Sequence, residues 1–200
     1  MIVAPVFFFA IFAMMDGGLL LYSINAVDQS ATIGSNSIAG LGEASNADLT
    51  ALQRMAAGGL ETTALIHVSQ VDVEELVTNS THDGFSTHSD GTPVVQTGCA
   101  NGPTGVDGID ECVDEYTFSG SGPSASVVVV NAWASCASST NDPSRCPPWP
   151  PSVRDVINGQ SSFVAIVVTY SYHFFTDIGG TFNLTATKTF RLEPETNASP

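Results

Sequence analysis

A nearly uncharged apolar segment at the start of the chain constrains the fold more than any other feature. Residues 2–24 contain one charged residue, Asp16, and twelve of them are Leu, Ile, Val or Phe. A helix that spans a bilayer needs about 20 mostly apolar residues. The twelve apolar side chains favour insertion by about 4 to 7 kcal/mol, which outweighs the cost of about 3 kcal/mol for one acid. We therefore predict a retained transmembrane anchor over residues 1–24.

A cleavable secretory signal is the alternative interpretation of this segment. Such a signal would need a basic region before the apolar run and small residues at its cleavage site. No base precedes the run, and the best cleavage candidate, Ile24-Asn25-Ala26, begins with a bulky residue. The retained anchor is therefore favoured. Because bases are missing, the positive-inside rule does not fix the orientation.

The cysteines provide the evidence for orientation. Cys99, Cys112, Cys136 and Cys146 lie in Gly-, Pro- and Asn-rich surroundings, which is typical of disulfides formed in an oxidising compartment. Three pairings are possible, and we favour closure between neighbours, Cys99–Cys112 and Cys136–Cys146. A zinc site is not expected, because zinc ligands usually include closely spaced Cys pairs. Residues 25–200 are thus predicted to form an extracytoplasmic domain with two cystine loops.

The charge balance limits the possible partners. Twenty acids and five bases give a formal net charge of −15. Nucleic-acid binding rests on clustered Lys and Arg and is therefore not expected. The sequence also contains neither a G-x-S-x-G elbow nor a phosphate loop. We expect no enzymatic activity and no cofactor, and we identify no small-molecule substrate.

Helical periodicity continues after the anchor. Mostly small side chains recur every three or four residues and could pack against another helix: Ala26, Ser30, Ile33, Ser37 and Leu41. A second helix is predicted to begin at an N-cap on Ser45, with Asp48 three positions later. Its apolar stripe would consist of Leu49, Leu52, Ala56 and Leu60.

Strand-like patterns dominate the rest of the chain. They cover residues 70–77, 126–133, 161–175 and 181–192. In the last of these, Lys188 is the one charged residue on the apolar side. Residues 78–122 are rich in turn formers and predict ordered loops with short strands near Val94 and Tyr116. The predicted class is α+β and pilin-like: a long N-terminal helix, transmembrane and then extracytoplasmic, packed on an antiparallel β-sheet.

Asp16 is the leading candidate for a specific contact. An acid inside a membrane segment can pair with a base or amine of a partner subunit and fix the register of an assembly. The alternative is that Asp16 lies near the outer interface and is hydrated there.

Three further groups of residues invite a functional interpretation, but a structural one is favoured for each. His82, Asp83, His88 and Asp90 could bind a metal ion, although their spacing fits no known pattern. An acidic group could bind calcium, but it lacks the usual spacing: Asp107, Asp110, Glu111, Asp114 and Glu115. Trp133, Trp149 and the run 147–151 could offer a binding surface or form a loop stapled over the sheet edge.

Short groups of residues at both ends of the chain resemble one known family. At the start these are Val3-Ala4-Pro5, the run 7–15, Asp16-Gly17, Leu21-Tyr22, Asn25-Ala26-Val27 and Ala31. Near the end these are Val167-Val168-Thr169-Tyr170, Leu184-Thr185-Ala186-Thr187 and Phe190-Arg191-Leu192-Glu193-Pro194. In these residues and in their order, the chain resembles TadE-like proteins. These are minor pseudopilins of the tight-adherence (Flp) pilus machinery.

The resemblance implies a location and a set of partners. It implies a single-pass protein of the bacterial inner membrane, with the C-terminal domain in the periplasm or outside the cell. It also implies contact with other pilus-assembly proteins and pilins through the N-terminal helix, and no enzymatic activity. Family members carry a short polar leader and a Glu ahead of the matching segment. Two explanations are open: the start codon lies upstream of Met1, which we favour, or this member is not processed.

Two other function classes remain open from the sequence. One is a membrane-anchored extracytoplasmic adhesin or ligand-binding module that uses the cystine loops directly. The other is a signal-anchored, metal-dependent enzyme built on the loop around His82 and His88.

Overall fold

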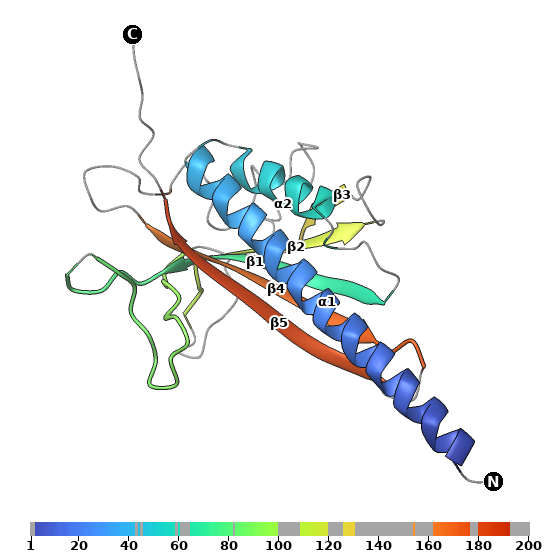
Figure 1. The fold of residues 1–200 in the computed structure, drawn as a ribbon. Helices are drawn as coiled ribbons and strands as arrows, with labels where there is room; N and C mark the ends of the chain where they lie inside the picture. The colour runs from blue at the N-terminus through green and yellow to red at the C-terminus, as the bar shows by residue number, and fades with distance from the viewer. Residues whose placement is uncertain are drawn as a thin grey trace.

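The computed structural model of the protein describes residues 3–42, 44, 46–58, 60, 65–81, 83–99, 109–119, 126–130, 154, 162–176 and 180–192. Within these residues, two helices cover one face of a five-stranded antiparallel sheet (Figure 1). This arrangement confirms the predicted α+β class, with a long N-terminal helix packed on an antiparallel sheet.

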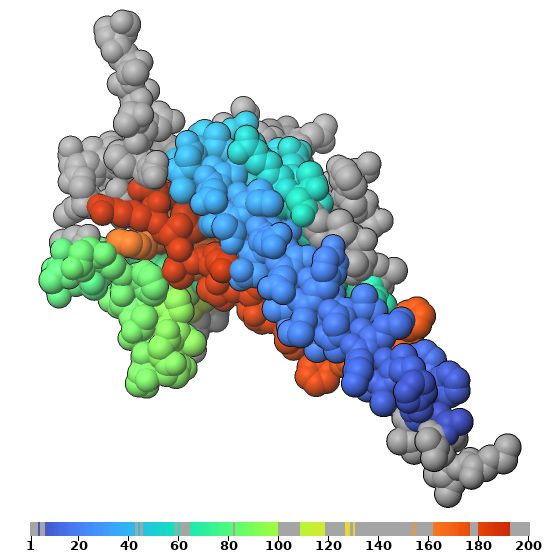
Figure 2. All heavy atoms as spheres, in the orientation of Figure 1, coloured from blue at the N-terminus to red at the C-terminus, as the bar shows by residue number. Residues whose placement is uncertain are grey.

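The N-terminal helix, α1, spans Val3–Leu41. At 1.5 Å per residue, its 39 residues extend over about 58 Å. Helix α1 ends where Gly42 adopts a left-handed conformation (φ of 52°), and the Gly42 N–H donates to Ile38 O at 2.9 Å. The N-terminal part projects beyond the sheet (Figures 1 and 2). Among the described residues, Phe7–Leu41 is the one helical stretch long and apolar enough to cross a membrane.

The second helix, α2, spans Ala47–Ala57 and packs beside α1. Its N-cap residue is Asn46, which makes no side-chain capping bond. The cap predicted at Ser45 lies outside the described residues, and the helix starts one position later than that cap would require. Of the predicted apolar stripe, Leu52, Ala56 and Leu60 are buried. The fourth member, Leu49, is half-buried.

The five strands are β1 (Ile66–Leu76), β2 (Val113–Ser119), β3 (Ser126–Val129), β4 (Phe163–His173) and β5 (Thr181–Arg191). Their spatial order is β3-β2-β1-β4-β5, and every neighbouring pair is antiparallel. Strand β1 begins at Ile66 rather than at the predicted residue 70. The pairing with β4 shifts register between Val68 and Gln70. This bulge breaks the period-two pattern and hides the first part of the strand from sequence reading.

Strand β5 has the alternation that the sequence predicts. Leu184, Ala186 and Phe190 are half-buried and pack against the main core. Lys188 lies on the same side, and its Nζ is 2.7 Å from Asp28 Oδ1 of α1. The charged residue that interrupts the apolar pattern is therefore paired with an acid on the covering helix.

The main core lies between the helices and the sheet. It includes Val27 and Ile38 of α1, Met55 of α2, Val71 of β1 and Ile166 of β4. The side chains of Leu76, Phe163 and Ala165 form a smaller cluster, against which Phe85 packs. Phe85 belongs to segment 83–99, which leaves the sheet as a separate lobe in Figure 2. A bridge between Leu76 and Val95 corresponds to the short strand expected near Val94.

Candidate functional site

Asp16 is held by the connection between β4 and β5. Its side chain is 6% exposed. Oδ1 accepts a hydrogen bond from the Phe175 backbone N–H at 3.1 Å, and Oδ2 accepts one from the Thr176 hydroxyl. The Tyr172 hydroxyl donates to the backbone carbonyl of Asp16 at 3.5 Å, the outer limit for such a bond. Residues far apart in sequence thus enclose this acid.

A cavity of about 280 Å³ lies beside Asp16. Apart from Asp16, most of its lining is apolar or small: Phe9, Phe12, Ala13, Gly17, Phe174 and Thr176. The carboxylate therefore lies between an apolar cavity and the donors of the β4–β5 connection. Within this chain the carboxylate already has two hydrogen-bond donors. Pairing with a partner subunit and hydration near the outer interface both stay predictions.

The packing of α1 on the sheet begins at Asp16, before the boundary predicted at residue 24. Leu19 and Leu20 are half-buried against the core, and Ser23 is buried. The described residues of segment 1–24 therefore fall into two parts, and the transmembrane anchor over this segment stays a prediction. Every side chain described within residues 3–15 is exposed, and several of the residues that follow are buried against the domain.

The exposed part of α1 carries many large apolar side chains. These are Phe7, Phe8, Phe9, Ile11, Phe12, Met14 and Met15, followed further along the helix by Leu21 and Tyr22. A continuous exposed apolar surface of this kind marks a membrane or protein contact. This surface is the strongest functional feature of the described residues.

The predicted packing stripe coincides only partly with the buried face of α1. Ser30 and Ser37 are buried, Ala26 and Leu41 are half-buried, and Ile33 is 39% exposed. The buried face itself is offset by about one residue and includes Ser23, Val27, Ala31, Gly34 and Ile38.

Gly34 shows what the small side chains on this face do. A Cβ added there would lie 2.8 Å from Met55 Cγ and 3.2 Å from Ile166 Cδ1. The small residues therefore let α2 and the sheet of the same chain approach α1 closely.

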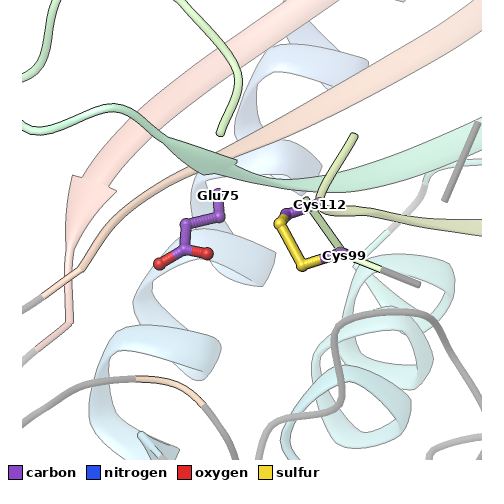
Figure 3. Close-up of side chains that lie close together, drawn as sticks. All are labelled: Glu75, Cys99 and Cys112. Atoms are coloured by element: carbon purple, nitrogen blue, oxygen red, sulfur yellow. A yellow bond between two sulfur atoms is a disulfide. The ribbon is translucent and has the colours of Figure 1, made fainter. Parts of the chain in front are cut away.

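The predicted disulfide between Cys99 and Cys112 is confirmed, with its sulfur atoms 2.06 Å apart. The predicted partners Cys136 and Cys146 lie outside the described residues. Figure 3 shows the Glu75 carboxylate beside this cystine. Glu75 Oε1 accepts a hydrogen bond from Ser162 Oγ at 3.0 Å.

Glu75 and the two cysteines are the one group in the described residues with metal-binding proximity. Both sulfur atoms are used in the disulfide, so these residues do not provide thiolate ligands.

The loop acids serve as turn caps. Asp83 accepts hydrogen bonds from Asn79 Nδ2 at 2.8 Å and Thr81 Oγ1 at 2.6 Å. Asp90 accepts from the backbone N–H of Thr92 at 3.0 Å and from its hydroxyl at 2.6 Å. These hydrogen bonds lower the pKa of both carboxyl groups. His82 of the same predicted metal group lies outside the described residues.

The acids around Cys112 are separated by the pleat of β2. Asp114 is opposite Val73 and fully buried, whereas Glu115 is opposite Asp72. Because successive side chains of a strand point to opposite faces, these two acids do not form one calcium site. Asp107 lies outside the described residues.

A buried ionic cluster escaped sequence analysis. Arg154 donates to Asp48 Oδ1 and Oδ2, both at 2.6 Å, and to Asp114 Oδ2 at 3.2 Å. The Tyr116 hydroxyl donates to Asp48 Oδ2 at 2.7 Å. The cluster ties α2 and β2 to Arg154.

Burial and the neighbouring acids act in opposite directions on the pKa of Arg154. Burial alone would lower the pKa of the guanidinium, but Asp48 and Asp114 outweigh it, so the pKa lies above its ordinary value. Burial also raises the pKa of Tyr116, and the two acids add to this effect. Arg154 is therefore charged and Tyr116 neutral throughout the physiological pH range.

Two acids of β1 are only partly exposed. Burial raises the pKa of Asp72 to about 6 and that of Glu74 to about 7. Glu115 adds to the effect on Asp72, while Asp72 and Glu111 add to that on Glu74. These groups bind protons near neutral pH.

Trp133, Trp149 and the run 147–151 lie outside the described residues. Comparison with family models, curated proteins and solved structures finds no match to this chain.

Proposed function

We propose that this protein is a minor pseudopilin-like structural component of the TadE type. It would take part in tight-adherence (Flp-type) pilus assembly, adhesion and secretion, with no enzymatic activity. The observation that carries the proposal is the dual use of α1. Residues 3–15 expose an apolar surface, and the rest of the same helix packs on an antiparallel sheet. The sequence resemblance at both ends of the chain supports the same assignment.

The proposed mechanism is packing of apolar helices. In the bacterial inner membrane, the exposed side chains of α1 would contact the N-terminal helices of pilins and other assembly proteins. Phe8, Phe9 and Met14 are 58%, 62% and 78% exposed, so contact at these positions requires no rearrangement of the domain. The domain formed by residues 25–200 would then lie in the periplasm or outside the cell.

Site-directed cross-linking tests this proposal in cells that produce the pilus machinery. Phe8→Cys and Met14→Cys, each labelled with a maleimide that carries a benzophenone, should cross-link on irradiation to C–H bonds of neighbouring pilins or assembly proteins. Thr185→Cys, on the exposed face of β5, is the matched control and should not cross-link through the helix contact. Release of the protein from membranes by alkaline carbonate, together with absence of cross-links at both helix positions, would refute the proposal.

An adhesin or ligand-binding module remains the second candidate because β5 has an exposed polar face. Asn183, Thr185, Thr187 and Thr189 are exposed there. Deletion of the secretion ATPase separates the two functions. Adhesion that depends on a pseudopilin should disappear in that strain, whereas adhesion by an anchored module should persist.

A further inference from the structure

The β4–β5 connection meets α1 at the level where the helix leaves the sheet. The Phe175 N–H and the Thr176 hydroxyl bind the two carboxylate oxygens of Asp16. Figure 1 shows this end of β4 and β5 beside the part of α1 that continues toward the N-terminus. These contacts fix the depth of the β4–β5 connection relative to the apolar helix.

Apolar side chains are exposed on both sides of this level. Leu21 and Tyr22, which are 64% and 60% exposed, lie beyond Asp16 on α1. Six residues of helix separate Asp16 from Tyr22, or about 9 Å. If the apolar surface of α1 lies in a bilayer as far as Tyr22, the β4–β5 connection lies at the same depth.

The sheet end itself exposes two phenylalanines. Phe175 is 59% exposed and Phe182 is 53% exposed. A chain of aromatic contacts supports them: the Phe174 ring lies 5.8 Å from that of Phe182 and 5.2 Å from that of Tyr172. Exposed apolar side chains such as Phe can be buried at the boundary between the headgroups and the acyl chains of a bilayer.

The described residues of this end suit a lipid surface. Residues 172–176 and 180–183 include neither Lys, Arg, Asp nor Glu, and Asp177 of the same connection lies outside the described residues. The nearby carboxylate, Asp16, is buried against its hydrogen-bond donors. An acid surrounded by donors is less costly to bring to a membrane than one without them.

We infer that the end of the sheet around Phe175 and Phe182 is seated in the headgroup region of the bilayer that α1 spans. This inference rests on the proposed membrane anchoring and adds a second, domain-borne contact with lipid. The β4–β5 connection would enter the interface together with Asp16 and supply the hydrogen bonds that the carboxylate needs there.

Depth-dependent fluorescence quenching tests the inference on the full chain in phosphatidylcholine vesicles. Trp133 and Trp149 are first replaced by Phe, and single tryptophans are then introduced by Phe175→Trp or Phe182→Trp. Both positions are more than half exposed, so the replacements leave the core unchanged. Phe9→Trp reports insertion of the helix. Thr189→Trp is the matched control on β5, seven residues from Phe182 or about 23 Å along the strand.

Lipids brominated near the headgroups should quench the Phe175→Trp and Phe182→Trp variants at least twofold more than the Thr189→Trp variant. Quenching of the Phe9→Trp variant alone would overturn the seating of the domain and leave the anchor intact. Absence of quenching in all variants would refute the anchoring and the seating together. A blue-shifted emission without quenching at positions 175 and 182 would show that protein, such as a second copy, covers this end, and would overturn the inference.

Discussion

Arg154 donates through both terminal nitrogens to the two carboxylate oxygens of Asp48, at 2.6 Å each, and both side chains are completely buried. Such bidentate geometry is the strongest form of an ion pair between these groups. Asp114 is the second acid on the same guanidinium. Arg154 therefore compensates two buried carboxylates with one guanidinium.

Replacing this arginine should destabilise the fold strongly. Arg154→Met leaves Asp48 and Asp114 without their buried counter-charge, and we expect a loss of about 3–5 kcal/mol in the free energy of unfolding. Urea denaturation of the protein in detergent micelles measures this loss. Lys188→Met is the matched control, because Lys188 and its partner Asp28 are 34% and 49% exposed. That change should cost less than about 1 kcal/mol. Equal effects of the two substitutions would contradict the assigned role of Arg154.

The close approach at Gly34 predicts opposite effects of the same substitution at two positions of α1. Gly→Ala in a helix stabilises by up to about 1 kcal/mol through backbone entropy. Gly40→Ala should show this gain, because a Cβ there would meet nothing within 4 Å. Gly34→Ala should instead destabilise by about 1–3 kcal/mol, since its Cβ would crowd Met55 and Ile166. Thermal unfolding compares the two variants, and equal melting temperatures would contradict the packing described here.

The raised pKa values of the two acids of β1 predict that the free energy of unfolding decreases as the pH rises. Burial raises the pKa of Asp72 from 3.8 to about 6 and that of Glu74 from 4.5 to about 7. Between the unfolded and the folded pKa values, the folded protein binds more protons than the unfolded chain. The free energy of unfolding should therefore decrease from about pH 4 to about pH 7.

Urea unfolding across this pH range measures the decrease. Glu74→Gln should flatten the slope and stabilise the protein at pH 8 by about 1–3 kcal/mol. Asp83→Asn is the control. The pKa of this exposed acid is lowered, so its titration affects the free energy of unfolding only at pH values below about 4. A steeper slope in the Glu74→Gln variant would contradict the prediction.

The disulfide should matter chiefly through the unfolded chain. The Cys99–Cys112 bridge closes a loop with a sequence separation of 13, for which the loss of chain entropy corresponds to about 3 kcal/mol. Cys99→Ser/Cys112→Ser should lower the urea midpoint accordingly. The decrease in stability with pH that comes from the titration of Glu74 should be unchanged. Reductant should shift the midpoint of the parent protein by more than that of the double variant. If reductant shifts the urea midpoint equally in the parent protein and in the double variant, the effect of reduction does not come from the Cys99–Cys112 bridge.

Much of the fold follows from local patterns. Alternation in residues 181–192 predicted β5 and its covered side, and periodicity after residue 24 predicted the continuation of α1 to Leu41. Each signal lies within a few neighbouring residues. The bulge in β1 shows the limit of this reasoning. One shift in register interrupts the alternating pattern, so the first four residues of the strand were not predicted.

The polar contacts depended on residues far apart in sequence. Arg154 reaches Asp48 across 106 positions, and Phe175 reaches Asp16 across 159. Sequence analysis singled out Asp16 but had no means of finding its donors. One usable signal existed: Asp114 and Lys188 each interrupt the apolar side of a strand, and both proved to have an ionic partner.

The unbroken course of α1 has a mechanical consequence. The helix runs from its exposed apolar end to Leu41 without a joint, and strands β4 and β5 lie against it. A tilt or rotation applied to the apolar end is therefore transmitted directly to the sheet. The helix and the sheet would therefore move as one body. A small change in the tilt of the N-terminal part of α1 would displace the parts of the domain farthest from it by a larger distance.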